Sequence, residues 1–371
     1  MLVRRLTAVL ALSVVLVLSG IAPPVWADDV DGDDVDDAID VCINTPPNTV
    51  VDAVGRPLGD VDLDCDSDLE DYALSLRGFT GRLAPLLRVI ETVPVGNAGN
   101  ESDTVGLDFG RVEYVYNIGK YEVTAGQYTA FLNSVAADDT YGLYNAMMWT
   151  DSFGCKIERT GSSGSYSYSV ASDWANRPVN YVSWGDAARF SNWLHNGRLP
   201  GAQDLTTTED GSYFLDGSTS DAALLAVVRE LNARWVIPSE DEWHKAAYHR
   251  NDGATGNYLI YPISSDSAPS NDLVDPDPGN NATFSDTGFT IGSPYYRTEV
   301  GAHQNSDSPY GTFDQGGNVL EWNEGVLLGP ERSFRGGSFR GSVGNLRSRA
   351  FGCWVPTGEG FDIGFRVAEV P

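Results

Sequence analysis

The chain has 371 residues, with 24 Lys and Arg against 52 Asp and Glu, and its formal net charge is −28. Hydrophobic residues make up 42% of the sequence, which is enough for the core of one large domain or two smaller ones. The charge argues against a duplex nucleic-acid binder and against docking on an anionic membrane surface, because both need clustered Lys and Arg.

The first 27 residues have the pattern of a secretory signal peptide. Arg4 and Arg5 precede the apolar run 6–18, and Ala27 stands at a suitable cleavage point after two prolines. We expect residues 1–27 to be removed and the soluble remainder to be secreted, periplasmic or held at the cell surface. An uncleaved anchor is the alternative, and the paired arginines leave Sec or twin-arginine export open. Loss of the two arginines changes the net charge from −28 to −30.

An acidic segment follows, in which residues 28–71 contain 16 Asp and Glu and one Arg, for a net charge of −15. A run this acidic repels itself unless cations neutralise it. Acids recur in residues 60–71 at the spacing of a twelve-residue calcium loop, with a backbone carbonyl at position 7. The predicted ligand residues are Asp60, Asp62, Asp64, Asp66, Asp68 and Asp71.

This loop resembles a dockerin-type calcium loop, and residues 29–42 resemble a thrombospondin type 3 calcium repeat. Two positions depart from the pattern, since Cys65 replaces the usual Gly and Asp71 is shorter than the usual Glu. A solvated acidic linker is the alternative interpretation. Cys42 and Cys65 can form a disulfide between the two loops in an exported chain. A dockerin-type function would imply a cohesin-like partner.

We assign residues 28–83 to this module and residues 84–371 to one domain. Three segments of the domain carry helix-start signatures, each a hydroxyl residue followed three positions later by an amide or acid. The starts are at Thr124, Ser183 and Ser239, and Gly197 is expected to end the second helix. Apolar residues spaced three and four apart then place one stripe of each helix in the core.

Short strands separated by Gly, Pro, Asn and Asp account for much of the rest. We predict strands over residues 112–118, 165–170 and 364–367. Residues 201–220 and 262–290 are predicted to be long loops, and a compact domain commonly uses such loops for binding or orders them with ions.

Seven motifs occur in a set order along the domain. They are IGKYEVT (118–124), RPVNYVSW (177–184), AARF (187–190), PSEDEW (238–243), YGTFDQGGNVLEW (310–322), RGGSF (335–339) and GFR (364–366). Together they resemble the sulfatase-modifying-factor family, whose domain is that of the formylglycine-generating enzyme. The resemblance implies an α/β (α+β) fold of the C-type-lectin-like kind with little regular secondary structure.

The resemblance also implies calcium. The matching family segment binds the ion through residues at the positions of Asp314, Gly317, Val319 and Glu321, which offer two carboxylates and two backbone carbonyls to a hard cation. A glycine-rich turn in which Glu321 pairs with an Arg is the alternative. Asn281 and Ala282 match part of a second family calcium site.

The family's substrate cleft would lie near five residues of this chain: Trp322, Arg335, Ser338, Arg347 and Arg349. The family's enzymes oxidise a sulfatase cysteine to formylglycine with Cu(I) held by two thiolates just after the Gly-Gly-Ser motif. Soft thiolates suit Cu(I), yet residues 339–349 of this chain contain no Cys. We therefore do not expect copper. A second departure is Leu320, where the family commonly has Trp.

Cys155 and Cys353 are the remaining cysteines, and a structural disulfide is the simplest role for them in an exported protein. A relocated copper pair is the alternative. The related sulfoxide synthases use three histidines and an extra domain. Here His244 and His249 are five apart on the third helix and do not share a face, so we expect surface or helix-cap roles.

Two hypotheses follow. In the first, the domain is a non-catalytic, calcium-stabilised recognition or structural module with a protein or glycan ligand. In the second, it is a formylglycine-generating or related oxidase that uses displaced groups, which requires free thiols at Cys155 and Cys353.

Overall fold

In the computed structural model, which describes residues 90–105 and 108–371, helices begin directly after each of the three predicted hydroxyl caps. At the first, the Gln127 N–H donates to Thr124 Oγ1 at 3.2 Å and the Thr124 N–H donates to Gln127 Oε1 at 2.9 Å. Such reciprocal bonds satisfy amides that have no partner inside the helix. The three helices are α2 (Ala125–Val135), α5 (Trp184–His195) and α7 (Glu240–Tyr248). Gly197 ends α5 with a φ of +72°, as predicted.

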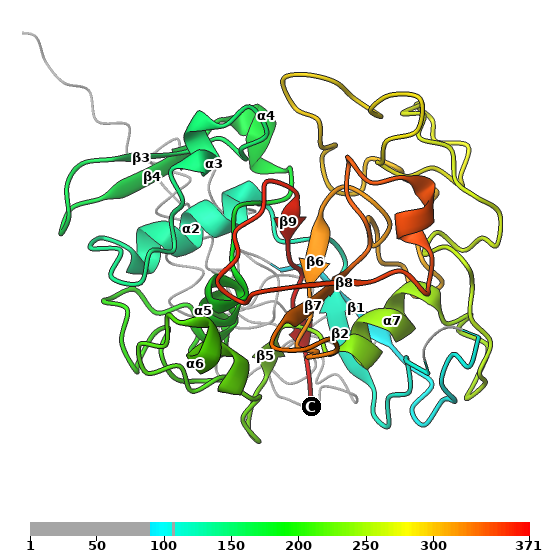
Figure 1. Cartoon of the computed structure of the whole chain (residues 1–371), viewed down its shortest axis with the longest axis horizontal. Coiled ribbons are helices and arrows are strands. Elements are labelled where there is room, and N and C mark those ends of the chain that lie inside the picture. The colour runs from blue at the N-terminus through cyan, green and yellow to red at the C-terminus, as the bar shows by residue number, and fades with distance from the viewer. Residues whose placement is uncertain (1–89, 106–107) are drawn as a thin grey trace, which may run out of the picture. The chain divides into compact units, whose positions relative to one another are not determined.

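The described strands are short and form three sheets (Figure 1). One has the order β1-β2-β10-β5, a hairpin joins β3 and β4, and the last has the order β8-β7-β6-β9, in which β6 and β9 run parallel. The strands are β1 (Thr92–Val95), β2 (Tyr116–Gly119), β3 (Ile157–Thr160), β4 (Ser167–Val170), β5 (Trp235–Val236), β6 (Leu320–Trp322), β7 (Arg332–Arg335), β8 (Gly352–Trp354), β9 (Ile363–Gly364) and β10 (Ala368–Glu369). Short helical turns complete the elements: α3 (Met147–Thr150), α4 (Ser172–Ala175), α6 (Asp221–Ala226) and the 3-10 turn η1 (Val343–Leu346).

Two predicted strands need correction. The strand expected at 112–118 begins only at Tyr116, because Val112 bonds through its N–H to the Asn100 side chain and through its carbonyl to the Gly99 N–H. The strand expected at 364–367 is split into β9 and β10. Between them the Arg366 side chain turns into the core. The hairpin strand predicted at 165–170 forms as β4.

Aromatic side chains dominate the main core. Phe131 of α2 and Phe190 of α5 meet edge to face, with ring centroids 5.3 Å apart, and Phe190 meets Phe365 in the same way. Helix α2 also packs on β4, and α5 packs on β5. The apolar stripes predicted for α2 and α5 therefore face this core, whereas Trp243 and Ala247 of α7 pack with Tyr248 in a separate cluster.

Both predicted long loops, 201–220 and 262–290, contain no helix or strand. Side-chain contacts order them. The first is held by a buried bidentate pair in which Arg189 Nε and Nη2 donate to Glu209 at 2.7 and 3.0 Å. The second has a small apolar cluster of its own, in which Phe284 and Ala282 pack with Tyr261 and Leu346.

The predicted signal peptide, the acidic module with its calcium loop, and Cys42 and Cys65 lie outside the described residues. Within the part that the structure describes, no helix has the length and apolar character needed to cross a membrane.

A buried ion pair joins the sheet that contains β2 to the sheet that contains β6. Arg366 donates through Nε and Nη2 to the two oxygens of Glu321 at 2.6 and 2.7 Å, and neither side chain is exposed. Nη1 of Arg366 also donates to the Gly119 carbonyl of β2 at 2.8 Å. Trp243 of α7 donates to Glu321 from its ring N–H at 2.6 Å. One side-chain pair thus connects β2, β6 and α7.

We predict that Arg366→Met lowers the free energy of unfolding by about 3–5 kcal/mol, because it leaves the Glu321 charge buried without its partner. Urea denaturation measures the loss. Arg111→Ala is the control, since its pair with Glu113 is 63% exposed on both sides and such exposed pairs contribute little to stability. Equal losses in the two variants would contradict this account.

Two acids interact near the start of α5, the buried Asp186 of its first turn and the partly buried Glu359. Burial raises the pKa of Asp186 to about 6, and burial together with the Asp186 charge raises the pKa of Glu359 to about 8. In the unfolded chain the pKa of Glu is about 4.3. Between about pH 4.3 and about pH 8 the folded state therefore holds the Glu359 proton more tightly than the unfolded state does. The contribution of Glu359 is therefore present in full below about pH 4 and is lost as the pH rises through about 8.

Glu359→Gln should consequently flatten the fall in stability between about pH 5 and 8, because the amide resembles the protonated carboxyl and cannot ionise. Melting temperatures measured across this range for the wild type and the variant test the prediction. Parallel curves would show that Glu359 does not titrate in this window.

Candidate functional site

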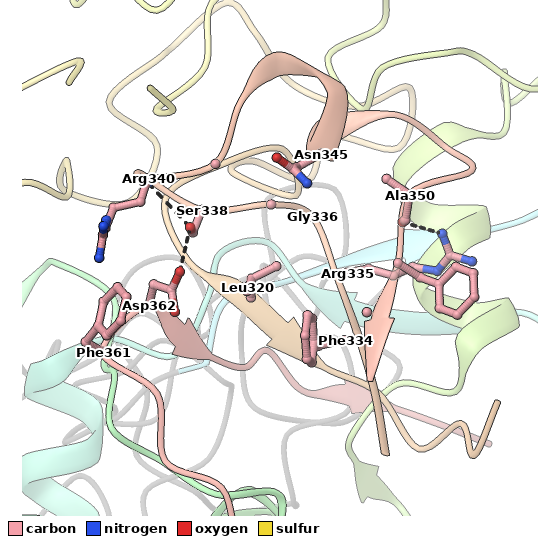
Figure 2. A pocket seen from close by; sticks show the side chains of 14 residues that line it. Leu320, Phe334, Arg335, Gly336, Ser338, Arg340, Asn345, Ala350, Phe361 and Asp362 are labelled. Atoms are coloured by element: carbon pink, nitrogen blue, oxygen red, sulfur yellow. Dashed lines mark hydrogen bonds between the residues drawn. The ribbon is translucent and has the colours of Figure 1, made fainter. Parts of the chain in front are cut away.

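A pocket of about 410 Å³ opens beside the sheet that contains β6, β7 and β8 (Figure 2). Its apolar lining comes from Leu320 of β6, Phe334 of β7, Phe351 and Phe361. Its remaining walls are Arg335, Gly336, Gly337, Ser338, Arg340, Gly341, Asn345, Ala350, Gly352 and Asp362. An apolar floor with a few polar groups is the usual composition of a ligand pocket.

A glycine is required where β7 and β8 pair. Phe334 and Gly352 are opposite each other, and a Cβ on Gly352 would lie 2.3 Å from the Phe334 ring. The missing side chain allows the ring to cover the strand and form part of the pocket. The rings and sheet therefore provide a preformed wall.

Polar groups form the opposite rim. Ser338 Oγ donates to Asp362 Oδ2 at 2.9 Å, and Figure 2 shows this bond beside Arg340. The exposed Arg340 guanidinium lies 4.9 Å from the centre of the Phe361 ring and 5.6 Å from that of Phe153. Burial raises the pKa of Asp362, while the Ser338 hydrogen bond acts in the opposite direction. The rim thus presents one positive and one acidic group over an aromatic surface.

The structure brings only two of the five predicted cleft residues to this pocket. Ser338 is at the rim, and Arg335 is in the wall, where its buried guanidinium bonds Glu240 and donates to the Ser348 carbonyl at 2.8 Å. Arg335 is therefore a structural residue.

The other three lie elsewhere. Trp322 is fully buried and donates to the Val182 carbonyl at 3.0 Å. Arg347 bonds the Tyr261 hydroxyl at 3.1 Å, and Arg349 is exposed but does not line the pocket. Trp322 is two residues after Leu320 on β6, so side-chain alternation does not separate the two, but Trp322 packs in the main core.

Sequence reasoning missed Arg340, Asn345, Phe361 and Asp362. Their positions carried a usable signal, because Arg340 directly follows RGGSF and Asp362 stands two residues before GFR. The two motifs lie on either side of β6, which pairs with β7 at Arg335 and with β9 at Gly364. Residues that flank both motifs therefore form a common rim.

Cys155 and Cys353 are free thiols, so the disulfide that we expected between them is not formed. Cys155 is buried in the main core with its Sγ 4.0 Å from the Asn180 carbonyl oxygen. Cys353 is on β8, paired with Ser333, and is partly exposed. Each thiol is thus held by a different part of the fold, and neither lines the pocket.

Cys353 should react with iodoacetamide in the native protein faster than Cys155, because Cys155 is completely buried and burial raises the pKa of its thiol. Peptide mass spectrometry after brief labelling separates the two sites, with labelling in urea as the control. A Cys155–Cys353 disulfide peptide under non-reducing conditions would contradict the structure.

The two histidines of α7 have structural surroundings. His249 is the C-cap, as one of the two expected roles requires, and its Nδ1 is 2.9 Å from the Tyr310 hydroxyl. His244 is not a surface residue, because Asp103 and Phe109 lie against it, and its Nε2 is 3.1 Å from Asp103 Oδ2. Burial lowers the pKa of His244 to about 4, so the ring is neutral at pH 7.

The predicted calcium residues from Asp314 to Glu321 lie in a turn that leads into β6. Asp314 offers the oxygen ligand that a hard cation prefers, and its partly buried carboxylate accepts the Gly301 N–H at 2.6 Å. Glu321 instead pairs with Arg366, the alternative that the sequence left open. Across residues 90–105 and 108–371, no three His, Cys, Asp or Glu side chains form a metal-binding group. Calcium at this turn stays a prediction.

The second predicted calcium segment is organised by a neighbouring acid. Asn281 Nδ2 donates to Asp277 Oδ1 at 2.7 Å, and the backbone N–H of Asn281 donates to Ser306 Oγ at 3.0 Å. The Ala282 N–H donates to the Ser270 carbonyl at 3.0 Å. These bonds account for the order of the segment.

Comparison with known proteins identifies the class. The profile of the sulfatase-modifying factor enzyme 1-like domain (FGE-sulfatase) matches residues 103–370, which is well over half of the chain. The chain therefore belongs to this family, and its mixed α/β architecture is that of the family's C-type-lectin-like fold. No curated protein matches the sequence.

Three solved structures show similarity to the chain. CarF is 22% identical, with a TM-score of 0.44 over 76% of this chain and 98% of CarF. Treponema denticola variable protein 1 is 20% identical, with a TM-score of 0.45 over 76% of this chain and 95% of its own. PvdO from Pseudomonas aeruginosa is 17% identical, with a TM-score of 0.40 over 75% and 90%.

Proposed function

We propose that this protein is an exported, non-catalytic member of the family, in which calcium stabilises a domain that recognises a protein or glycan ligand. The observation that carries the proposal is the pocket itself. Its lining is aromatic with a charged rim, and it includes no Cys or His. Such a surface can bind and orient a ligand, but it offers no soft ligand for Cu(I).

Recognition would use the groups at the rim. Arg340 can donate to a ligand carboxylate or hydroxyl while its guanidinium stays over Phe361. Asp362 can accept from a ligand hydroxyl or amide N–H. The rings of Phe334 and Phe361 offer flat apolar area to either a peptide side chain or a sugar face.

The free thiols keep an oxidase as the second candidate, since a displaced copper pair would need them. The different surroundings of the two thiols argue against such a copper pair. Cys155 is enclosed by the core, where burial raises the pKa of its thiol and so disfavours the thiolate that a metal needs.

The full-length protein given Cu(I), O₂ and a Cys-x-Pro-x-Arg peptide should produce no formylglycine. Mass spectrometry of the peptide, with an active formylglycine-generating enzyme as the positive control, provides the measurement. Conversion of the cysteine, or copper bound tightly through two sulfur atoms, would overturn the proposed non-catalytic role.

Arg340→Ala should weaken binding to any ligand found on a defined glycan or peptide array by at least about tenfold, because a charge-assisted hydrogen bond contributes roughly 1.5–3 kcal/mol. Arg111→Ala, an exposed arginine outside the pocket, is the matched control. Equal affinity in both variants would place recognition somewhere other than this pocket.

A further inference from the structure

Arg340 is an exposed arginine whose guanidinium is held in place over two aromatic rings, those of Phe361 and Phe153 (Figure 2). Within residues 90–105 and 108–371, this guanidinium donates no hydrogen bond and forms no ion pair, while the Arg340 backbone N–H bonds Ser338 Oγ at 3.4 Å. A guanidinium that is positioned in this way keeps its donors open to a ligand.

The segment around Arg340 is positively charged, although the chain as a whole is acidic. Residues 332–358 contain five Arg and no Asp or Glu, whereas the full sequence has 52 acids. Arg332 and Arg335 are buried and bond groups inside the domain. Arg340, Arg347 and Arg349 stay partly or fully exposed, and none of them pairs with an acid in the part of the chain that the structure describes. This segment therefore provides local attraction for an anion on a protein that otherwise repels anions.

Two acids lie on the segments beside Arg340. Asp362 accepts the Ser338 hydroxyl at 2.9 Å. Asp286 is exposed and follows Ser285, whose N–H donates to the Gly341 carbonyl at 2.8 Å. Neither acid forms an ion pair with Arg340. The charge of Arg340 is therefore available to a ligand.

An aromatic surface, made of Phe153, Tyr296 and Phe289, adjoins Arg340 outside the pocket. The ring centroids of Phe153 and Tyr296 are 4.7 Å apart, and those of Tyr296 and Phe289 are 5.1 Å apart. The fully buried Phe339 supports this surface from below, with its centroid 6.2 Å from those of Tyr296 and Phe289. Phe289 is 41% exposed. Because Arg340 also lines the pocket, it lies where the pocket and the aromatic surface meet.

The pocket presents the face of a sheet to its ligand rather than a strand edge. Phe334 is directly opposite Gly352 on β8 and Trp322 on β6, and Leu320 is two residues from Trp322, so all four residues share one face. Extended peptides commonly bind by adding main-chain hydrogen bonds at a sheet edge. A sugar ring instead needs flat apolar area for its C–H face and side-chain partners for its hydroxyls, which the rings and the polar rim supply.

We propose that the pocket and the aromatic surface bind an acidic oligosaccharide, in which a uronic-acid carboxylate is held by the Arg340 guanidinium. One sugar lies in the pocket against Phe334, and the next lies over Phe289. The planar fork of Arg accepts a carboxylate through two parallel hydrogen bonds. The assignment rests on the proposed recognition role and narrows its ligand to an anionic glycan. It also disfavours a Cys-x-Pro-x-Arg peptide, because the Arg of that peptide would be repelled by Arg340.

The test measures binding of the full-length protein to defined oligosaccharides by calorimetry. The acidic probes are the trisaccharides of galacturonate, mannuronate and glucuronate. Each is compared with its carboxyl-reduced form, in which hydroxymethyl groups replace the carboxylates. At least one acidic probe should bind about tenfold or more tightly than its reduced form, because the carboxylate adds a charge-assisted hydrogen-bonded pair. Raising the ionic strength should reduce this difference, since salt screens an exposed pair.

Two variants locate the carboxylate and the second sugar. Arg340→Gln should weaken the acidic probe by about tenfold or more and change the reduced probe by less than about threefold. Phe289→Ala should weaken the trisaccharide by about three- to tenfold and leave the monosaccharide unaffected, because a single sugar in the pocket does not reach this ring. Both residues are exposed, so unchanged melting temperatures check that the variants fold. Arg111→Ala is the matched control and should bind as the wild type does.

The opposite results are equally clear. Equal binding of the acidic and reduced probes would overturn the role of the carboxylate and leave a neutral glycan as the ligand. Tighter binding of hexaglutamate than of every acidic oligosaccharide would assign the site to an acidic protein segment instead. Wild-type affinity in Arg340→Gln, or no binding of any acidic probe, would overturn the whole assignment. None of these results restores catalysis, which depends separately on whether formylglycine is formed.

Discussion

The buried pair of Arg366 and Glu321 is the contact on which the rest of the domain depends. It links the C-terminal segment to β2, to β6 and, through Trp243, to α7. Because both side chains are excluded from water, the pair stabilises little relative to an apolar core, but the loss of either partner is costly. The main effect of the pair is therefore to fix where the C-terminal segment lies. It brings the segment before Arg366 against β6, and that parallel pairing creates the pocket rim.

The pocket and the acidic residues near this pair differ in chemical character. On one side, Leu320 and Phe334 present apolar surface, with Arg340 and Asp362 at the rim. On the other, Glu122 and Asp314 lie near Arg366, and burial raises the pKa of both carboxyls. Function is then decided by side chains at the rim, because a shared fold does not transmit chemistry by itself.

Local signals were reliable where the chain interacts with itself over a few residues. The caps at Thr124, Ser183 and Ser239 were predictable because a hydroxyl and an acid or amide three positions apart need only each other. The long loops were predictable from composition. The strand expected at 364–367 was not, because its geometry is set by Arg366 reaching Glu321, a residue 45 positions away. The Cys155–Cys353 disulfide failed for the same reason, since pairing depends on where two distant segments lie.

The sequence by itself determined the family, the absence of thiolates after the Gly-Gly-Ser motif, and the helix starts, because these depend on residue identity and short spacing. Only the tertiary structure decided which residues share a site. It removed Trp322 from the predicted cleft, placed Arg340 and Asp362 at one rim, and left the oxygens of Glu122 buried without a hydrogen-bond partner. These outcomes follow from packing and charge balance between segments far apart in the chain, which no local pattern records.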